Sequence, residues 1–125
     1  MIKSFRDLDV WQASMDLVDM AYDLSERFPR HEMFGLGREV RRSAISIPSN
    51  IAEGSRQRTT PGKIHSMATA NASDAELETQ LEIALRRRYV TERDIRRAQA
   101  LANQISKMLY GLVNSLEGQR DGERR

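Results

Sequence analysis

Four segments of the sequence carry apolar residues in steps of three and four, and this spacing constrains the fold more than any other feature. The segments extend over Leu8–Phe28, Leu36–Ile51, Thr60–Leu85 and Ile95–Leu116. Steps of three and four place side chains on one face of an α-helix. No segment alternates apolar and polar residues as a half-buried strand does. The spacing therefore predicts an all-α fold with four amphipathic helices.

Short polar segments connect these predicted helices. Pro29 ends the first helix, because a residue before proline is pushed out of the α region. We expect Thr60 to be the N-cap of the third helix, with Pro61 as its first residue. Thr91 and Asp94 resemble a capping box before the fourth helix. Helices with short connections pack most simply as an antiparallel up-down-up-down four-helix bundle, so we expect that architecture.

The length of 125 residues fits a single domain that can bury a core of its own. We assign residues 1–117 to this domain and expect residues 118–125, which include no apolar residue, to form a disordered tail. The sequence has no cysteine, which excludes thiol catalysis and zinc–thiolate sites and suits a reducing compartment. No apolar run approaches the roughly 18 residues of a membrane span. A cytoplasmic protein without a membrane partner is the expectation.

Pro48 lies in the middle of the second apolar stripe, within the segment RRSAISIPSNIAEGSR. The stripe continues in register across Pro48 to Ile51. We therefore expect one helix that is kinked at Pro48 and ends near Gly54. The proline ring removes the hydrogen bond to the carbonyl of Ala44, which must find another partner.

Polar residues around Pro48 are candidates to supply that partner, namely Ser43, Ser46, Ser49 and Asn50. Two interpretations of the segment remain open. In the first it is a structural motif that bends the helix and satisfies its own backbone, formed by Pro48, Asn50, Glu53 and Gly54. In the second, Asn50 and Glu53 bind a ligand or nucleic acid.

Residues that could carry enzyme chemistry are sparse. The two histidines, His31 and His65, lack the helical partners of a metal site. Asp74, Glu78 and Glu82 stand four apart on the third helix, and such a row is more typical of a solvated face or of partners for arginines than of a general acid and base. The sequence therefore indicates no catalytic, metal-binding or cofactor-binding residue, no small-molecule substrate and no enzyme activity.

Charge alternates along the chain although the net value is only +2. The balance of acidic and basic residues is −5 for residues 7–32, +4 for 33–63, −4 for 64–85 and +4 for 86–97. In an antiparallel bundle, the start of the second helix and the turn between the third and fourth lie at one end. We expect that end to bring together Arg38, Arg41, Arg42, Arg86, Arg87, Arg88, Arg93, Arg96 and Arg97.

Six of these arginines follow the starts of the second and fourth helices, where the helix dipole disfavours a cation by about 0.3–1 kcal/mol. Something else must favour them. Salt bridges to an acidic helix of a neighbouring subunit, phosphate binding and unpaired solvation remain open. The aromatic residues near these arginines are Phe34 and Tyr89, so base stacking and sequence readout are not expected.

Three segments resemble a known family. They are FRDLDVWQASMDLV, FP followed by FGLGREVRRSAISIPSNIAEGS, and ASDAELETQLEIAL. From Phe5 to about Leu116, the chain resembles the four-helix-bundle proteins found as reading frames in intervening sequences of 23S ribosomal RNA. The accessory variability determinant of diversity-generating retroelements is related to that family. This chain departs from the usual pattern at Arg87 and Arg88, where a small or glycine-containing turn is commoner.

The resemblance implies a ring-shaped homo-oligomer, typically a pentamer, without enzyme activity. For the retroelement branch it implies nucleic-acid binding and a reverse-transcriptase partner. The alternating charges also suit a head-to-tail contact that closes as a ring. Two functional hypotheses follow. The first is a non-catalytic oligomeric adaptor that binds RNA or DNA phosphates through its arginine-rich end, together with a polymerase-like protein. The second is a structural or protein-interaction ring whose charges are used between subunits.

Overall fold

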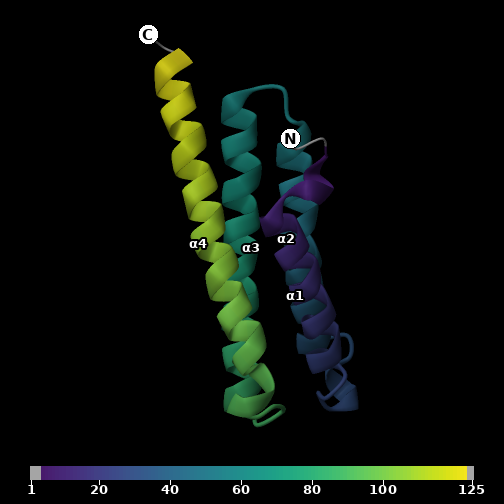
Figure 1. Ribbon diagram of the computed structural model, residues 1–125. Helices are drawn as coiled ribbons and strands as arrows, with labels where there is room; N and C mark the ends of the chain where they lie inside the picture. Colours follow the sequence, from purple (N-terminus) through teal and green to yellow (C-terminus); the bar gives the residue numbers. More distant parts are fainter. Residues whose placement is uncertain (1–3, 124–125) are drawn as a thin grey trace.

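The computed structural model describes residues 4–123, which form four long α-helices and two short 3-10 helices (Figure 1). Successive long helices run in opposite directions, and each contacts the next, while α1 also contacts α4. The described residues contain no strand. The expected antiparallel four-helix bundle is confirmed. In chain order, its elements are η1 (Phe5–Asp7), α1 (Asp9–Ser25), η2 (Arg30–Glu32), α2 (Leu36–Arg56), α3 (Thr60–Arg86) and α4 (Glu92–Glu123).

One hydrophobic core lies between the four helices. Its residues recur in steps of three and four on every helix, as the sequence spacing predicts. Burial of these side chains is the main favourable contribution to folding. The largest fully buried apolar side chains are Leu17, Val40, Ile47, Ile51, Leu77, Leu81, Ile95, Ile105 and Leu109.

The starts of α3 and α4 are held by side-chain caps. At α4 the predicted capping box is confirmed, because Thr91 N donates to Asp94 Oδ2 at 2.9 Å and Asp94 N donates to Thr91 Oγ1 at 3.2 Å. At α3 the N-cap is Thr59 and not Thr60. The Thr59 Oγ1 accepts from Gly62 N at 3.1 Å, which places Pro61 at the second helical position.

Helix α2 continues through Pro48 without interruption and ends two residues beyond Gly54. Polar side chains bond to backbone carbonyls beside the proline, but among the described residues none of these bonds goes to the carbonyl of Ala44, for which a partner was expected. Ser49 Oγ donates to the carbonyl of Ile45 at 2.9 Å, and Asn50 Nδ2 donates to that of Ser46 at 2.8 Å. These are the two carbonyls that follow Ala44 in the chain. The kink at Pro48 stays a prediction.

Helix α4 continues to Glu123, so residues 118–123 are helical and differ from the expected disordered tail. Residues 124–125 lie outside the described residues. Adding turns to a formed helix costs little, because each residue gains a backbone hydrogen bond without a new nucleus. A tertiary contact also holds the last turn, since Thr60 Oγ1 and Glu123 Oε1 are 3.0 Å apart.

Within residues 4–123, no helix has an apolar stretch long enough to cross a membrane.

Candidate functional site

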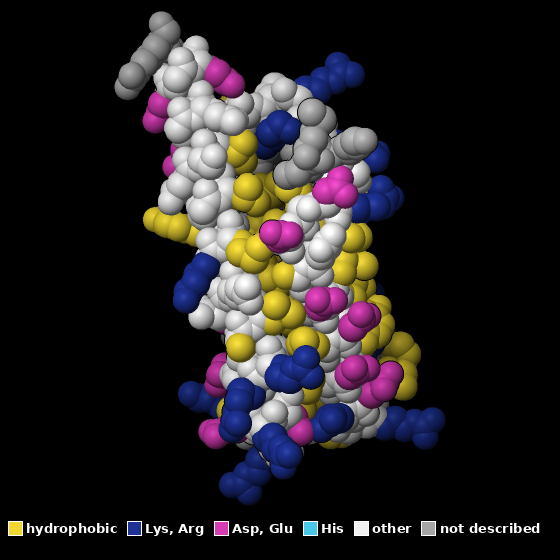
Figure 2. All heavy atoms as spheres, in the orientation of Figure 1, with side chains coloured by type: hydrophobic (Ala, Val, Ile, Leu, Met, Phe, Trp, Pro, Cys, Tyr) yellow, Lys and Arg dark blue, Asp and Glu magenta, His cyan; other side chains and the backbone are white. Residues whose placement is uncertain are grey.

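Exposed arginines gather at one end of the bundle, where α2 begins and α3 turns into α4 (Figures 1 and 2). The antiparallel topology brings these segments together although they lie far apart in the sequence. Their guanidinium groups form no hydrogen bond or ion pair within residues 4–123. We call this set the arginine end, and it consists of Arg38, Arg42, Arg86, Arg87, Arg88, Arg93, Arg96 and Arg97.

Arg41 belongs to the set expected from the sequence, but the structure gives it another role. Its side chain is half-buried, with Nη1 3.3 Å from Ser25 Oγ and Nη2 2.8 Å from the carbonyl oxygen of Met33. These hydrogen bonds join α2 to the end of α1 and to the connection between them. Arg41 therefore stabilises the turn and is not an exposed ligand for an anion.

The helix dipole acts on fewer arginines than the sequence spacing indicates. Arg38 is the third residue of α2, and Arg93 is the second residue of α4. The other arginines of these two helices lie beyond the first turn, where the effect of the dipole falls off. The unfavourable interaction with the helix dipole therefore acts in full only on Arg38 and Arg93 within this set.

Arg88 has an unusual backbone conformation, with φ at +63°, and is the only non-glycine residue with positive φ in the described part of the chain. Tyr89 N donates to the carbonyl of Ala84 and Arg88 N to that of Leu85, both at 3.0 Å, which forms a Schellman motif. Glycine is the usual residue at this position, because a side chain there costs roughly 1 kcal/mol. The bundle thus presents an arginine where its backbone favours glycine.

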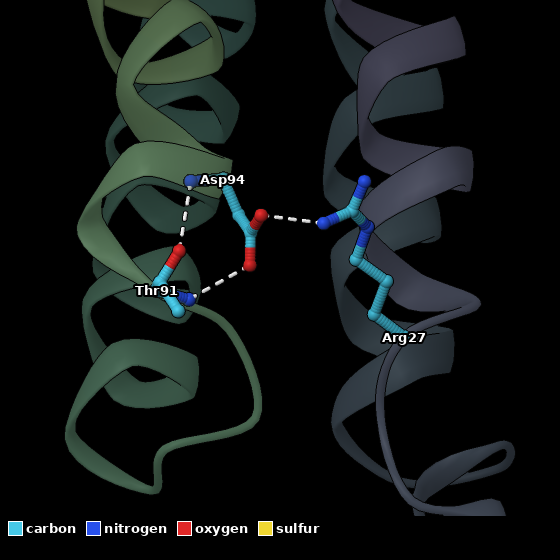
Figure 3. A network of polar contacts seen from close by, with 3 residues as sticks. All are labelled: Arg27, Thr91 and Asp94. Carbon is cyan, nitrogen blue, oxygen red and sulfur yellow. Dashed lines mark hydrogen bonds and ion pairs between the residues drawn. The ribbon is translucent and has the colours of Figure 1, made fainter.

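The ion pair between Arg27 and Asp94 joins the end of α1 to the first turn of α4 (Figure 3). Among residues 4–123, no other basic nitrogen lies within 4.0 Å of an acidic oxygen. The Asp94 pKa is lowered, chiefly by the hydrogen bond from the backbone of Thr91, with smaller contributions from Thr91 Oγ1 and Arg27. Asp94 is therefore occupied by its own cap and by Arg27.

Glu32 links the connection before α2 to the turn before α4. Its Oε1 accepts from Leu36 N at 3.1 Å, and its Oε2 accepts from the hydroxyl of Tyr89 at 2.9 Å. The hydrogen bond from Leu36 is the main cause of the lowered pKa of Glu32, followed by that from Tyr89. The sequence interpretation missed this role, although an acidic residue just before a helix start is a usable signal.

Arg30 in η2 also lies at this end of the bundle and is exposed. The sequence interpretation left it out because it considered the start of the second helix and the turn between the third and fourth helices, and not the connection before α2. Arg30 extends the basic surface beyond the arginine end as defined here.

The Pro48 motif lies along α2, away from the arginine end. Pro48 and Gly54 are buried, Asn50 is half-buried and Glu53 is exposed. A Cβ on Gly54 would lie 2.9 Å from Ser66 Cβ and 3.0 Å from Met67 Cε, so the glycine allows α2 to approach α3. The amide of Asn50 is bonded within α2. These contacts favour the structural interpretation of the motif.

The acidic row on α3 is not one solvated face. Asp74 is fully buried, Glu78 is half-buried, and Glu82 is exposed and accepts from Gln99 Nε2 at 2.9 Å. In residues 4–123, no group of three acidic or histidine side chains is placed to hold a metal ion.

The helices and their arrangement define a small all-α protein of the four-helix-bundle class, with a basic end. Residues 6–111 match the family of 23S rRNA-intervening sequence proteins, and the chain belongs to that family. The family resemblance seen in the sequence is thereby confirmed. The relation to the accessory variability determinant stays a prediction.

A solved structure of similar fold is described as a protein with unknown function from the S23 ribosomal protein family of Bacteroides thetaiotaomicron. The two chains are 22% identical, with a TM-score of 0.78 over 84% of this chain and 95% of that one. At this identity the likeness shows the fold alone. No curated protein matches the sequence significantly.

Proposed function

We propose that this protein is a non-catalytic oligomeric adaptor whose arginine end binds the phosphate groups of RNA or DNA. The observation that carries the proposal is the gathering of eight exposed guanidinium groups that have no bonding partner in the described chain. A guanidinium group presents a planar set of donors that matches the oxygens of a phosphate.

Two further observations support a role for these cations. Arg38 and Arg93 stand in first helical turns, where the dipole disfavours them. Arg88 occupies a backbone conformation that favours glycine. An anionic partner would offset both unfavourable contributions.

The aromatic side chains at this end favour binding without sequence preference. Phe34 is 80% exposed, but the ring of Tyr89 packs against Phe28, and its hydroxyl is bonded to Glu32. A single free aromatic ring offers little stacking for successive bases. Contacts to phosphates carry affinity but no sequence information.

The second candidate function is a structural ring in which the arginine end contacts another copy. An acidic surface on α1 favours it, because Asp16, Asp19 and Asp23 are exposed along that helix and the exposed Glu26 is its C-cap (Figure 2). A ring-shaped homo-oligomer such as a pentamer, and a polymerase-like partner, are parts of the adaptor proposal that rest on the family resemblance.

Binding of RNA and DNA probes at different salt concentrations tests the proposal. The logarithm of affinity should fall with the logarithm of salt concentration, with a slope of roughly −0.7 to −0.9 for each phosphate engaged. Replacing Arg93, Arg96 and Arg97 together by Gln should weaken binding equally across sequences and flatten the slope by about two to three units.

A matched control removes three exposed cations elsewhere, through Arg56→Gln, Arg58→Gln and Lys107→Gln. The control has the same net charge as the test variant and should keep most of the affinity. Light scattering coupled to gel filtration gives the oligomeric state of each variant. If the Arg93, Arg96 and Arg97 variant dissociates, or if wild-type protein binds no probe at about 50 mM salt, the structural ring is favoured.

A further inference from the structure

Asp74 is a carboxyl group in the middle of an apolar core. It lies on the face of α3 that carries Ala70, Leu77 and Leu81, and its exposed fraction is 0%. No N–H or hydroxyl group within residues 4–123 donates to either carboxyl oxygen. The one group within hydrogen-bond reach is the carboxyl of Glu78, and a hydrogen bond between two carboxyl groups requires a proton on one of them. An ionised carboxylate in this position would give up its hydration without any replacement, whereas a protonated carboxyl would avoid most of that cost.

The helices packed against α3 offer no compensating charge. Between α2 and α3, the polar side chains beside Asp74 in sequence are neutral and bond to one another, because Ser46 Oγ of α2 is 2.8 Å from Ser73 Oγ of α3 and 3.0 Å from Asn50 Nδ2. No basic side chain in the described parts of α1, α2 or α4 forms an ion pair with Asp74. The charged group that does act on it is Glu78, one turn further along α3.

We propose that Asp74 is a proton-binding switch in the core, protonated while the bundle is folded at neutral pH, and that loss of its proton loosens the packing of α3 against its neighbours. The inference is independent of what the arginine end binds.

Burial, followed by the neighbouring Glu78, raises the pKa of Asp74 to about 8. In the unfolded chain the same carboxyl titrates near its ordinary value of about 3.9. Between these two values the folded bundle holds a proton that the unfolded chain has released. Stability therefore falls as pH rises from about 4 to about 8, by up to tenfold in the folding equilibrium constant for each pH unit, and levels off above that range.

The test compares denaturant unfolding of wild type and Asp74→Asn from about pH 5 to about pH 9. The amide of Asn resembles the neutral acid in shape but cannot ionise. We expect the ratio of the two folding constants to change steeply up to about pH 8 and then to level off. Parallel stability profiles for the two proteins would overturn the proposal.

Two neighbouring variants sharpen the comparison. Glu78→Gln removes the like charge beside Asp74, so the pH above which stability stops falling should be lower than in wild type. Glu76→Gln removes an exposed carboxylate of the same helix and should leave the wild-type profile in place. A shift of equal size in both variants would assign the effect to net charge and contradict the proposal.

An infrared measurement keeps the proposal testable if Asp74→Asn fails to fold. Folded wild-type protein at about pH 7 should show the C=O stretch of a protonated carboxyl, which ordinary surface carboxylates lack at this pH. The band should persist in Glu76→Gln and fade as pH rises through about 8. Its absence from folded wild-type protein at neutral pH would refute the switch directly.

Discussion

Arg27, which lies two residues beyond the end of α1, forms an ion pair with Asp94 of α4, with 2.5 Å between Arg27 Nη1 and Asp94 Oδ1 (Figure 3). The other carboxylate oxygen of Asp94 accepts the backbone N–H of Thr91. One side chain thus caps a helix and connects the first helix to the last. Asp94 is also the acidic residue that stands between Arg93 and Arg96 in the sequence, and it is paired with Arg27 and not with either of them.

The first prediction concerns acid stability. Because the folded pKa of Asp94 is lowered, its contribution should be complete above the unfolded value of about 3.9 and disappear as pH falls through the folded value. Asp94→Ala should lower the melting temperature at neutral pH, and the difference from wild type should shrink in acid. Arg27→Ala should cost less, because the cap from Thr91 remains. Equal losses for the two variants would contradict this order of contributions.

The second prediction concerns the strained turn between α3 and α4. Arg88→Gly should raise the free energy of unfolding by about 1 kcal/mol, because glycine adopts positive φ without the cost of a side chain. Arg88→Ala is the matched control, since it removes the same guanidinium group but keeps a Cβ. Denaturant unfolding checks both variants. Equal stabilisation by Ala and Gly would show that charge, and not backbone strain, is relieved.

The third prediction concerns the contact between α2 and α3. Gly54→Ala should lower stability by about 1–3 kcal/mol, because the new Cβ would meet Ser66 Cβ and Met67 Cε at 2.9 and 3.0 Å. Gly118→Ala is a control in the exposed part of α4, where a Cβ meets nothing within 4 Å. It should gain up to about 1 kcal/mol from helix propensity. A neutral Gly54→Ala variant would mean that the two helices can separate slightly at little cost.

The fourth prediction separates two adjacent arginines. Arg41→Ala should lower stability by about 1–2 kcal/mol, because it removes the hydrogen bonds to Ser25 and Met33. Arg42→Ala should change stability by less than about 0.5 kcal/mol and instead weaken nucleic-acid binding, since Arg42 is exposed and unbonded within the described chain. Thermal unfolding and probe binding measure the two effects. The assignment fails if the two variants lose stability equally.

Much of the fold could be predicted because its determinants are local. The spacing of Leu36, Val40, Ala44, Ile47 and Ile51 defines one face of a helix, and that face remains continuous through Pro48. The capping box before α4 needs only two residues three positions apart. Short connections then impose the antiparallel order, and this order alone places the arginines of three segments at one end.

The sequence by itself therefore determined the helices, their order and the position of the arginine end. Only the tertiary structure decided which polar side chains of one pattern are buried. Asp74, Glu78 and Glu82 recur every four residues, and each step of four turns about 40° around the helix axis. Because of this rotation, Asp74 lies in the core and Glu82 lies in solvent. Which residue of the row is the last to be buried depends on how α2 and α4 pack against α3.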